Sequence, residues 1–255
     1  MTPTPETFRP ENYRPDPSRS DGTGRGAACP VALVTGASRG IGRAIADALA
    51  PDHHLILGGR DRDALAELAT AYPSAEPFAV DLADPDAVAA AVAALELPRG
   101  LDALIHSAGI LVSGRVEELT AADWARSLTT NVTAVADLTR LLLPALRAAR
   151  GIVVTINSGS GFTAGAGGGA YAASKFALRA FADALRDEER EHGVRVSSIH
   201  PGRVDTDMQH ELRAYESGDY EAENYLRPES VAQAVRLAVT APPEASVDTL
   251  AIRPR

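Results

Sequence analysis

Seven short apolar runs alternate along this chain with longer stretches rich in alanine and leucine, and this alternation narrows the possible folds more than any other feature. The apolar runs have the length of strands and lack a regular polar alternation, as expected for strands buried on both faces. They cover residues 31–35, 55–58, 78–80, 101–105, 152–156, 194–199 and 247–252. The stretches with a helical pattern lie near residues 41–50, 62–71, 85–95, 121–149, 172–191 and 229–240. Buried strands separated by helices predict a parallel sheet covered by helices on both faces.

The length and composition fit one domain of this kind. A chain of 255 residues, 45% of them hydrophobic, can bury one substantial core. We therefore expect an α/β fold over residues 29–255, a doubly wound Rossmann-type sheet of about seven strands. Such sheets bind ligands at the carboxyl ends of their strands, where the strand order reverses. Residues 1–28 contain five prolines and no Leu, Ile or Val, a composition that predicts a disordered tail.

The charge of the chain and its lack of long apolar segments exclude several function classes. The formal net charge is -9, so the surface repels phosphate backbones and we expect no nucleic-acid partner. No apolar stretch approaches the roughly 20 residues of a membrane helix, and the amino terminus has no apolar core of the secretory type. Cys29 is the single cysteine and cannot form an internal disulfide, which agrees with a reducing compartment. We expect a cytoplasmic protein without membrane contact and without a bound metal.

A glycine-rich turn joins the first predicted strand to the first predicted helix. It reads Thr35-Gly36-Ala37-Ser38-Arg39-Gly40-Ile41-Gly42. Gly36 permits a tight turn off the strand, Gly40 lets a pyrophosphate approach the backbone, and Gly42 allows the helix to pack closely on the sheet. The N–H groups at the start of the helix attract phosphate. Glycines in such a turn can be purely structural, but the position between a strand and a helix favours dinucleotide binding.

Further motifs match one family over about residues 31–255. His106-Ser107-Ala108-Gly109 follows the fourth strand, and Asn131 lies in the next long helical stretch. Ser158 precedes Tyr171-Ala172-Ala173-Ser174-Lys175, and Pro201-Gly202-Arg203-Val204-Asp205-Thr206 closes the sixth strand. Together with the Thr-Gly-xxx-Gly-x-Gly turn, these motifs make the chain resemble the short-chain dehydrogenase/reductase (SDR) superfamily in its compact single-domain form. His106 stands where that family usually has Asn, and without an acidic or metal-ligand neighbour we interpret it as structural.

The resemblance implies a nicotinamide-dependent oxidoreductase that interconverts a carbonyl (ketone or aldehyde) and an alcohol. The catalytic residues that it implies are Asn131, Ser158, Tyr171 and Lys175. The cofactor-binding residues that it implies are Gly36, Ser38, Arg39, Gly40, Ile41, Gly42, Arg60, Asp81, Leu82, Ser107, Ala108, Gly109, Asn131, Tyr171, Lys175, Pro201, Gly202, Val204 and Thr206. The alternative is a non-catalytic Rossmann module that senses or binds the cofactor, for which a broken catalytic set would be the mark.

The end of the second predicted strand favours NADP(H) over NAD(H). An acidic residue at this point would bind the ribose 2′-hydroxyl of NAD, but by the family pattern Gly59 occupies the acidic position. Arg60 and Arg39 are placed to meet a 2′-phosphate, for which a guanidinium is a natural partner. Asp61 weakens this argument if its carboxylate pairs with Arg60.

Tyr171 and Lys175 are four residues apart and share one face of their helix. A tyrosine with its ordinary pKa near 10 is a poor proton donor or acceptor at neutral pH, and we expect the ammonium of Lys175 to lower the pKa of Tyr171. In the family, Ser158 would hold the substrate oxygen, Asn131 would anchor a water next to Lys175, and Lys175 would also bind the nicotinamide ribose. In reduction, Tyr171 would protonate the carbonyl oxygen.

Two of the cofactor-binding residues, Asp81 and Thr206, could instead have the purely structural role of capping a helix. Asp81 and Leu82 resemble the family's adenine-contacting pair, and Thr206 resembles the residue that holds the nicotinamide carboxamide. Asp and Thr also cap helices well, so Asp81 and Thr206 have a purely structural alternative.

For the substrate-binding side and for the contacts between subunits, the sequence predicts regions of the chain rather than single residues. Residues 207–227, which contain three tyrosines, occupy the place of the family's substrate lid. Residues 165–169 read Gly-Ala-Gly-Gly-Gly, which predicts an open, mobile wall beside Tyr171. Ordinary surface loops are the alternative for both segments.

The family commonly pairs the helices near 131–149 and 171–191, so we expect a homodimer or homotetramer.

Overall fold

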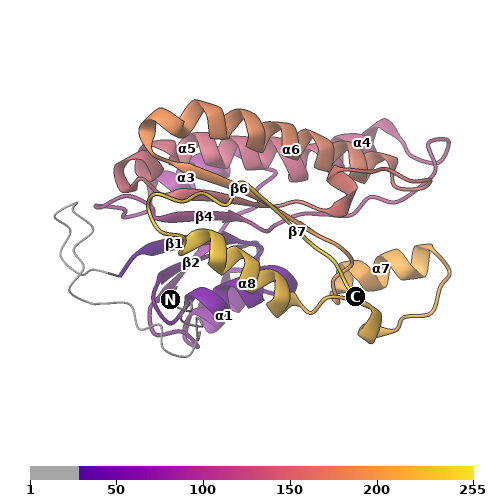
Figure 1. Ribbon diagram of the computed structural model, residues 1–255, viewed down its shortest axis with the longest axis horizontal. Coiled ribbons are helices and arrows are strands. Elements are labelled where there is room, and N and C mark those ends of the chain that lie inside the picture. Colours follow the sequence, from indigo (N-terminus) through magenta and orange to yellow (C-terminus); the bar gives the residue numbers. More distant parts are fainter. Residues whose placement is uncertain (1–28) are drawn as a thin grey trace, which may run out of the picture.

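The computed structural model describes residues 29–255, and the tail predicted over residues 1–28 lies outside the described residues. Seven parallel strands form one sheet in the order β3-β2-β1-β4-β5-β6-β7 (Figure 1). The strands are β1 (Val31–Thr35), β2 (His54–Gly59), β3 (Ala75–Ala79), β4 (Ala103–His106), β5 (Ile152–Ile156), β6 (Arg195–Pro201) and β7 (Thr249–Ile252). The prediction of a doubly wound, Rossmann-type parallel sheet is confirmed.

Helices cover both faces of this sheet (Figure 1). One face carries α1 (Gly40–Leu49), α2 (Arg62–Ala69) and α8 (Pro228–Val239), whose apolar residues form one buried cluster with the strands. The other face carries α3 (Pro85–Ala93), α5 (Ala134–Ala149) and α6 (Gly169–Glu189) around a second buried cluster. Two further helices, α4 (Ala121–Leu128) and α7 (Asp207–Tyr215), lie toward the carboxyl ends of the strands.

The alternation of side chains along each strand divides the core between these two layers. Ala32 and Val34 of β1 belong to the cluster beneath α1 and α8, whereas Leu33 between them belongs to the cluster beneath α5 and α6. All three residues are fully buried. A strand with a helical layer on each face must be apolar at every position, which is why β1 is a continuous apolar run.

Two elements differ from the sequence prediction for local reasons. β3 begins at Ala75, before the apolar run at 78–80, and it includes Pro77 because it pairs only with β2 and lies at the edge of the sheet. The single helix predicted over 121–149 is divided by a π-helical turn, Thr129–Thr133, which separates α4 from α5. Such turns carry an irregular hydrogen-bond pattern that apolar periodicity does not reveal.

The predicted lid and glycine-rich wall are more helical than expected. α7 fills Asp207–Tyr215, the first part of the 207–227 segment, and the short helical turn Ala222–Asn224 follows it. α6 begins at Gly169, so the last glycine of the 165–169 run is its first residue.

The strand order reverses at β1, which lies between β2 and β4. From this strand the chain first builds the sheet toward β3 and then, in the other direction, toward β7. In open sheets of this kind ligands bind outside the carboxyl ends of the strands at the reversal. The glycine turn after β1 and the loop after β4 therefore flank the expected site. Within residues 29–255, no helix combines the length and the apolar character that a membrane crossing requires.

Candidate active site

The glycine turn packs against the loop that follows β4. Gly36 has a left-handed backbone conformation (φ +68°), and a Cβ atom there would lie 3.0 Å from the backbone of Ala108. A Cβ atom on Gly42 would lie 2.1 Å from the carbonyl oxygen of Gly36, so only glycine lets α1 begin this close to the turn. No side chain caps the first turn of α1. Its leading N–H groups therefore face the turn without a side-chain partner, as a phosphate site requires.

Thr35 holds these two loops together, although it was not predicted as a site residue. Its hydroxyl donates to the carbonyl oxygen of Ile105 (3.4 Å) and accepts from the N–H groups of Ser107 (3.0 Å) and Ala108 (3.1 Å). Thr35 is buried at the end of a strand that is otherwise apolar. A lone polar residue at that place was the signal available in the sequence.

The side chains around the turn differ in exposure. Ser38 and Arg39 are exposed, whereas Ile41 packs against the buried cluster beneath α1. Arg60 is exposed directly after β2. Asp61 caps α2 by accepting from two backbone N–H groups at 3.1 Å each, and within residues 29–255 no ion pair joins it to Arg60. The objection that Asp61 neutralises Arg60 therefore does not hold.

Asp81 and Leu82 follow β3 on the same edge of the sheet. Asp81 is exposed and accepts from the N–H group of Ala83 (3.0 Å). The residue that caps α3 is Asp84, so the alternative in which Asp81 caps this helix is wrong. Leu82 packs against the buried cluster beneath α5.

Three predicted catalytic residues meet between β5 and α6. Ser158 is the second residue after β5, and α6 carries Tyr171 and Lys175 one turn apart. The Ser158 side chain lies close enough to the Tyr171 hydroxyl to influence its pKa. The Lys175 ammonium nitrogen lies 5.6 Å from the centre of the Tyr171 ring and donates to the carbonyl oxygen of Ile156 (2.9 Å). The arrangement is a pair of hydroxyls with a buried cation behind it.

Burial controls the ionisation of this group. Burial raises the pKa of Tyr171 above its ordinary value of 10.0, and the hydrogen bond with Ser158 acts in the opposite direction. Burial also lowers the pKa of Lys175 to about 8. The predicted net lowering of the Tyr171 pKa is therefore wrong: the pKa is raised, because desolvation of the phenolate by burial is the largest effect.

Asn131 connects the catalytic helix to the loop after β4. It is buried on the π-helical turn. Its Oδ1 accepts from the N–H group of Ile110 (2.9 Å), and its Nδ2 donates to the Ile110 carbonyl oxygen and to the Ser174 hydroxyl (3.0 Å each). A Cβ atom on Gly109 would lie 3.2 Å from Asn131 Oδ1 and 3.9 Å from Lys175 Nζ. The Asn131 side chain thus serves as a bridge, and its role toward a water stays a prediction.

The segment after β6 faces the glycine turn. Pro201 and Val204 are buried and Gly202 is half-buried. The Thr206 methyl group lies 3.3 Å from where a Cβ atom on Gly40 would be. The Thr206 hydroxyl donates to the Val204 carbonyl oxygen (3.2 Å), and although Thr206 precedes α7 it makes no side-chain cap. Thr206 therefore occupies the N-cap position of α7, as the alternative predicted, but its hydroxyl does not cap the helix.

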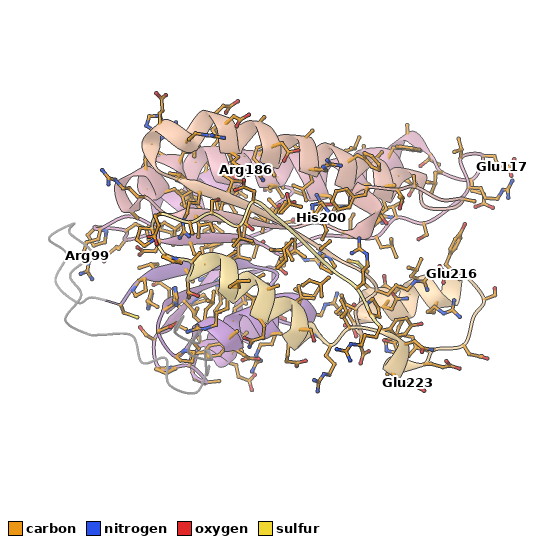
Figure 2. The ribbon with its side chains drawn as sticks, in the orientation of Figure 1. Arg99, Glu117, Arg186, His200, Glu216 and Glu223 are labelled. Atoms are coloured by element: carbon orange, nitrogen blue, oxygen red, sulfur yellow. The ribbon has the colours of Figure 1, made fainter. Side chains whose placement is uncertain are left out.

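The predicted lid contacts both walls of the site. At its start, Asp207 forms an ion pair with Arg39 (2.8 Å) in which the two side chains are 66% and 73% exposed. At the end of α7, the Tyr215 hydroxyl lies against Gly167, where a Cβ atom would be 2.7 Å away. The N–H group of Gly114 donates to the Gly167 carbonyl oxygen (2.8 Å). Figure 2 labels Glu216 at the end of α7 and Glu223 in the turn beyond it.

Two polar side chains close to the catalytic group escaped the sequence analysis. Asn157 Oδ1 accepts from the N–H group of Ser158 (2.9 Å), and Asn157 Nδ2 donates to the Lys175 carbonyl oxygen (3.2 Å). His200 Nδ1 lies 3.0 Å from the Ser158 carbonyl oxygen. Neither lies in a motif that singles it out, and only the pairing of β5 with β6 brings His200 near Ser158.

His106 has the structural environment expected of it. It is buried, and its Nε2 lies 2.8 Å from the Thr139 hydroxyl on α5. Because that hydroxyl donates its own proton to the Val135 carbonyl oxygen, His106 Nε2 is the donor. Burial lowers the pKa of His106 to about 3, so the ring is neutral at ordinary pH and ties the end of β4 to α5.

The sheet and the residues gathered at its carboxyl edge define an oxidoreductase of the Rossmann type. Residues 30–217 match the family model described as short chain dehydrogenase, and the chain belongs to this family. An uncharacterized oxidoreductase of Staphylococcus saprophyticus is 32% identical over 88% of this chain and 97% of its own length. The serine 3-dehydrogenase of Agrobacterium fabrum is 31% identical over 87% of this chain and 92% of its own length.

A solved structure shows the same similarity at the level of the fold. It is an alcohol dehydrogenase from the archaeon Thermococcus sibiricus complexed with 5-hydroxy-NADP. It superposes with a TM-score of 0.79 at 29% identity, over 88% of this chain and 96% of that chain. The fold and family therefore agree on an SDR oxidoreductase.

Proposed function

We propose that the protein is an NADP(H)-dependent oxidoreductase that interconverts a ketone or aldehyde with the corresponding alcohol. The observation that carries the proposal is the grouping of the Ser158 and Tyr171 hydroxyls, with the buried ammonium of Lys175 5.6 Å from the centre of the Tyr171 ring. The Thermococcus sibiricus protein, which shares the fold, is an alcohol dehydrogenase complexed with 5-hydroxy-NADP. That likeness supports both the reaction class and the cofactor.

The residues at the carboxyl edge fit a dinucleotide. Any side chain at Gly36 or Gly42 would collide with neighbouring backbone, so the turn keeps an open backbone surface at the start of α1. Gly109 provides a similar close approach beside Asn131 and Lys175, where the nicotinamide end would lie. When bound, the nicotinamide supplies or accepts the hydride.

Arg39 and Arg60 would hold the 2′-phosphate that distinguishes NADP(H). Both are exposed and follow neighbouring strands, β1 and β2, and Gly59 places no carboxylate between them. Arg39 is paired with Asp207, but an ion pair this exposed contributes little free energy. Its guanidinium can therefore exchange the carboxylate for a phosphate.

Tyr171 would move the proton of the reaction. Because burial keeps its pKa above the ordinary value, Tyr171 is protonated at neutral pH and is suited to donate to a carbonyl oxygen. The Ser158 hydroxyl, which lies next to Tyr171, would hold that oxygen. Lys175, with a pKa of about 8, is mainly an ammonium at pH 7 and would stabilise the phenolate that Tyr171 leaves behind.

We also propose that the protein assembles as a homodimer or homotetramer. Phe176 on α6 is 43% exposed and Leu237 on α8 is 57% exposed. Apolar side chains on the outer helices of both layers would be covered in such an assembly. Light scattering of the purified chain measures its mass directly, and a monomer would contradict this proposal.

Loss of NADPH absorbance with a panel of ketones, aldehydes and quinones tests the reaction. We expect oxidation of NADPH that requires both the protein and a carbonyl compound. The Tyr171→Phe variant lacks only the hydroxyl, so it should bind NADPH normally and turn over at least about 10²-fold more slowly. Binding of NADPH without turnover of any carbonyl would show the non-catalytic module instead.

A further inference from the structure

His200 is a fully buried polar side chain in the strand next to the catalytic turn. It lies near the carboxyl end of β6, and its side chain shares a strand face with Val196, which packs beneath α5 and α6. The ring of Phe162 lies over the imidazole with ring centres 4.2 Å apart. Because buried polar groups require hydrogen-bond partners, the partners of the two ring nitrogens indicate the purpose of the residue.

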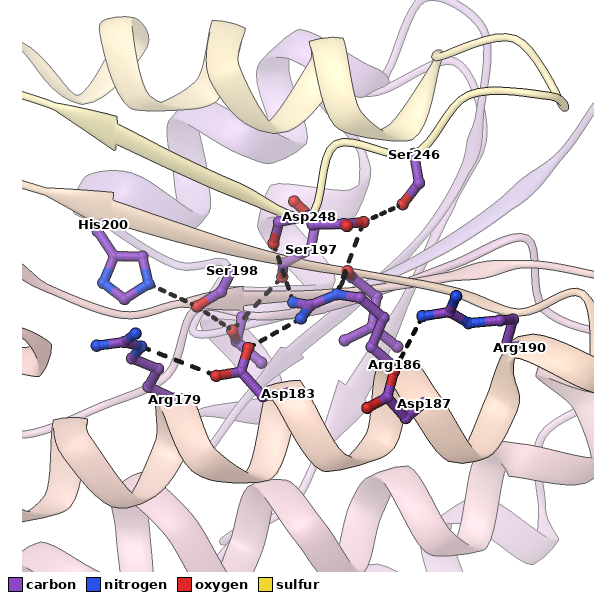
Figure 3. Close-up of polar contacts among 12 residues, drawn as sticks. Arg179, Asp183, Arg186, Asp187, Arg190, Ser197, Ser198, His200, Ser246 and Asp248 are labelled. Atoms are coloured by element: carbon purple, nitrogen blue, oxygen red, sulfur yellow. Dashed lines mark hydrogen bonds and ion pairs between the residues drawn. The ribbon is translucent and has the colours of Figure 1, made fainter.

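Both ring nitrogens of His200 are hydrogen bonded. Nδ1 lies 3.0 Å from the Ser158 carbonyl oxygen, and Nε2 lies 2.9 Å from the Ser198 hydroxyl (Figure 3). A carbonyl oxygen can only accept, so Nδ1 carries the proton and Nε2 of the neutral ring accepts from Ser198. The Ser198 oxygen in turn accepts from the Thr155 hydroxyl (3.2 Å). A directed chain of hydrogen bonds therefore runs from Thr155 to the backbone of Ser158.

The surroundings keep this ring neutral. Burial lowers the pKa of His200, the Ser158 carbonyl oxygen acts in the opposite direction, and the cations of Arg179, Arg253 and Lys175 lower it further. Arg253 also donates to the backbone carbonyl oxygen of His200 (2.7 Å). The single ring proton is thus donated to the Ser158 carbonyl oxygen, and the fully buried ring cannot contact a substrate.

We propose that His200 is a positioning residue that sets the Ser158 hydroxyl against the Tyr171 hydroxyl. Ser158 is also held by the Asn157 side chain at its N–H group (2.9 Å) and by the N–H group of Ser160 at its hydroxyl (3.1 Å). Those two contacts come from residues of the same turn. The contact with His200 ties Ser158 to a separate strand, so it fixes the turn relative to the sheet. The inference rests on the proposed function, because the placement of Ser158 is read from the rate of that reaction.

Two variants of His200 test this role. His200→Leu removes the hydrogen bond to Ser158, whereas His200→Asn keeps an amide N–H group close to the place of Nδ1. Since small misplacements of a reacting group are costly, we expect His200→Leu to lower kcat by about 10–100-fold and to leave NADPH affinity within about twofold. His200→Asn should recover most of kcat. Stopped-flow single-turnover rates and cofactor titration measure the two quantities.

A second buried histidine provides the matched control. His53 lies at the amino ends of the strands, where its Nδ1 is 2.7 Å from Asp52, and His53→Leu should lower thermal stability without changing kcat. If His200→Leu does not fold, Ser198→Ala removes the donor to Nε2 together with the acceptor for Thr155, keeps the Nδ1 contact with Ser158, and should lower kcat by a smaller factor. Wild-type kcat in His200→Leu, or in Ser198→Ala when the Leu variant is unfolded, would overturn the positioning role. Equal loss in His200→Leu and His200→Asn would do the same, whereas an inactive wild type would overturn the proposed function itself.

Discussion

The catalytic group and the α7 segment lie at the same edge of the sheet but are held in different ways. Ser158 and Lys175 are tied to buried strands and helices by short hydrogen bonds to the backbone and to buried side chains. α7 contacts the walls of the site through exposed or loop groups: the ion pair between Arg39 and Asp207 at its start, and the Tyr215 hydroxyl against Gly167 at its end. Groups that transfer a proton must be placed within fractions of an ångström, whereas a segment that covers a substrate must also release it.

Side chains of α7 and of the turn after it make ion pairs and ring contacts with one another and with the residues just before α7. Glu216 forms ion pairs with Arg203 (2.6 Å) and with Arg213 (2.7 Å). The Tyr220 ring stacks on His210 with centres 3.6 Å apart, and its hydroxyl donates to Asp205. These contacts run to Arg203 and Asp205, which precede α7. Backbone hydrogen bonds of Leu226 with Arg203 (2.9 Å) and with Asp205 (2.8 Å) hold the far end of the 207–227 segment in the same place.

The largest effect is expected from variants of Tyr171 and Lys175, which belong to the firmly held group in this comparison. Lys175→Ala removes the charge behind Tyr171 and would also remove the proposed contact with the nicotinamide ribose, so it should slow turnover and weaken NADPH binding, whereas Tyr171→Phe should affect turnover alone. Because the two residues act as a unit, the double variant should turn over little more slowly than the slower single variant, with each loss at least about 10²-fold. Single-turnover rates and cofactor titration measure this. Multiplicative losses in the double variant would contradict a shared unit.

The next effect concerns the contact between the cofactor turn and the lid. Arg39→Ala and Arg60→Ala should each weaken NADPH binding by about 10–100-fold and leave NADH binding unchanged, because only the former has a 2′-phosphate. Asp207→Ala is the control, since it frees Arg39 and should not weaken NADPH binding. Fluorescence titration with both cofactors measures the ratio. An equal loss for NADH and NADPH would place the arginines elsewhere on the cofactor.

A smaller effect is expected at the contact between Tyr215 of α7 and Gly167. Gly167→Ala places a methyl group against the Tyr215 hydroxyl at a residue with φ +75°, so it should displace α7 and raise the substrate KM several-fold, with little change in NADPH affinity. Gly165→Ala is the matched control, because a Cβ atom there meets nothing within 4 Å. Steady-state kinetics of both variants decide the question. An unchanged KM in Gly167→Ala would mean that α7 does not contact the substrate.

The smallest effect on activity is expected from an ion pair far from the site, in which the Glu189 side chain is buried and the Arg147 side chain is partly exposed. Glu189 on α6 accepts two hydrogen bonds from Arg147 on α5, at 2.7 Å and 2.9 Å, and these lower the pKa of Glu189 below 4.5. Its contribution to stability is therefore present above pH 4.5 and is lost as the pH falls through the lower folded-state pKa. Glu189→Gln should lower Tm by about 3–6 °C at pH 7, by less in acid, and leave kcat unchanged.

An exposed ion pair on the same helix is the control for that prediction. Asp187 and Arg190 are 2.9 Å apart with side chains 78% and 75% exposed. Asp187→Asn should leave Tm almost unchanged at every pH, because solvent screens the pair. Calorimetry across the pH range compares the two variants, and a Tm difference for Glu189→Gln that persists unchanged in acid would exclude the ion pair as its cause.

Local patterns carried much of the prediction. The continuous apolar runs identified the strands because strands covered on both faces have no polar alternation. The four-residue spacing of Tyr171 and Lys175 placed them on one helix face, and α6 has them there. The π-helical turn at Asn131 and the helix within the lid were missed, because the first is a hydrogen-bond irregularity and the second is a short helix rich in polar residues.

The sequence by itself determined the order of strands and helices, the glycine turn and the helix that carries Tyr171 and Lys175, since each depends on residues that are close along the chain. Only the tertiary structure decided the contact of His200 with Ser158, which are 42 residues apart, and the ion pair of Arg39 with Asp207, which are 168 apart. It also decided the direction of the Tyr171 pKa shift. The reason is physical: burial and long-range contacts depend on how the layers pack, and a local pattern contains neither.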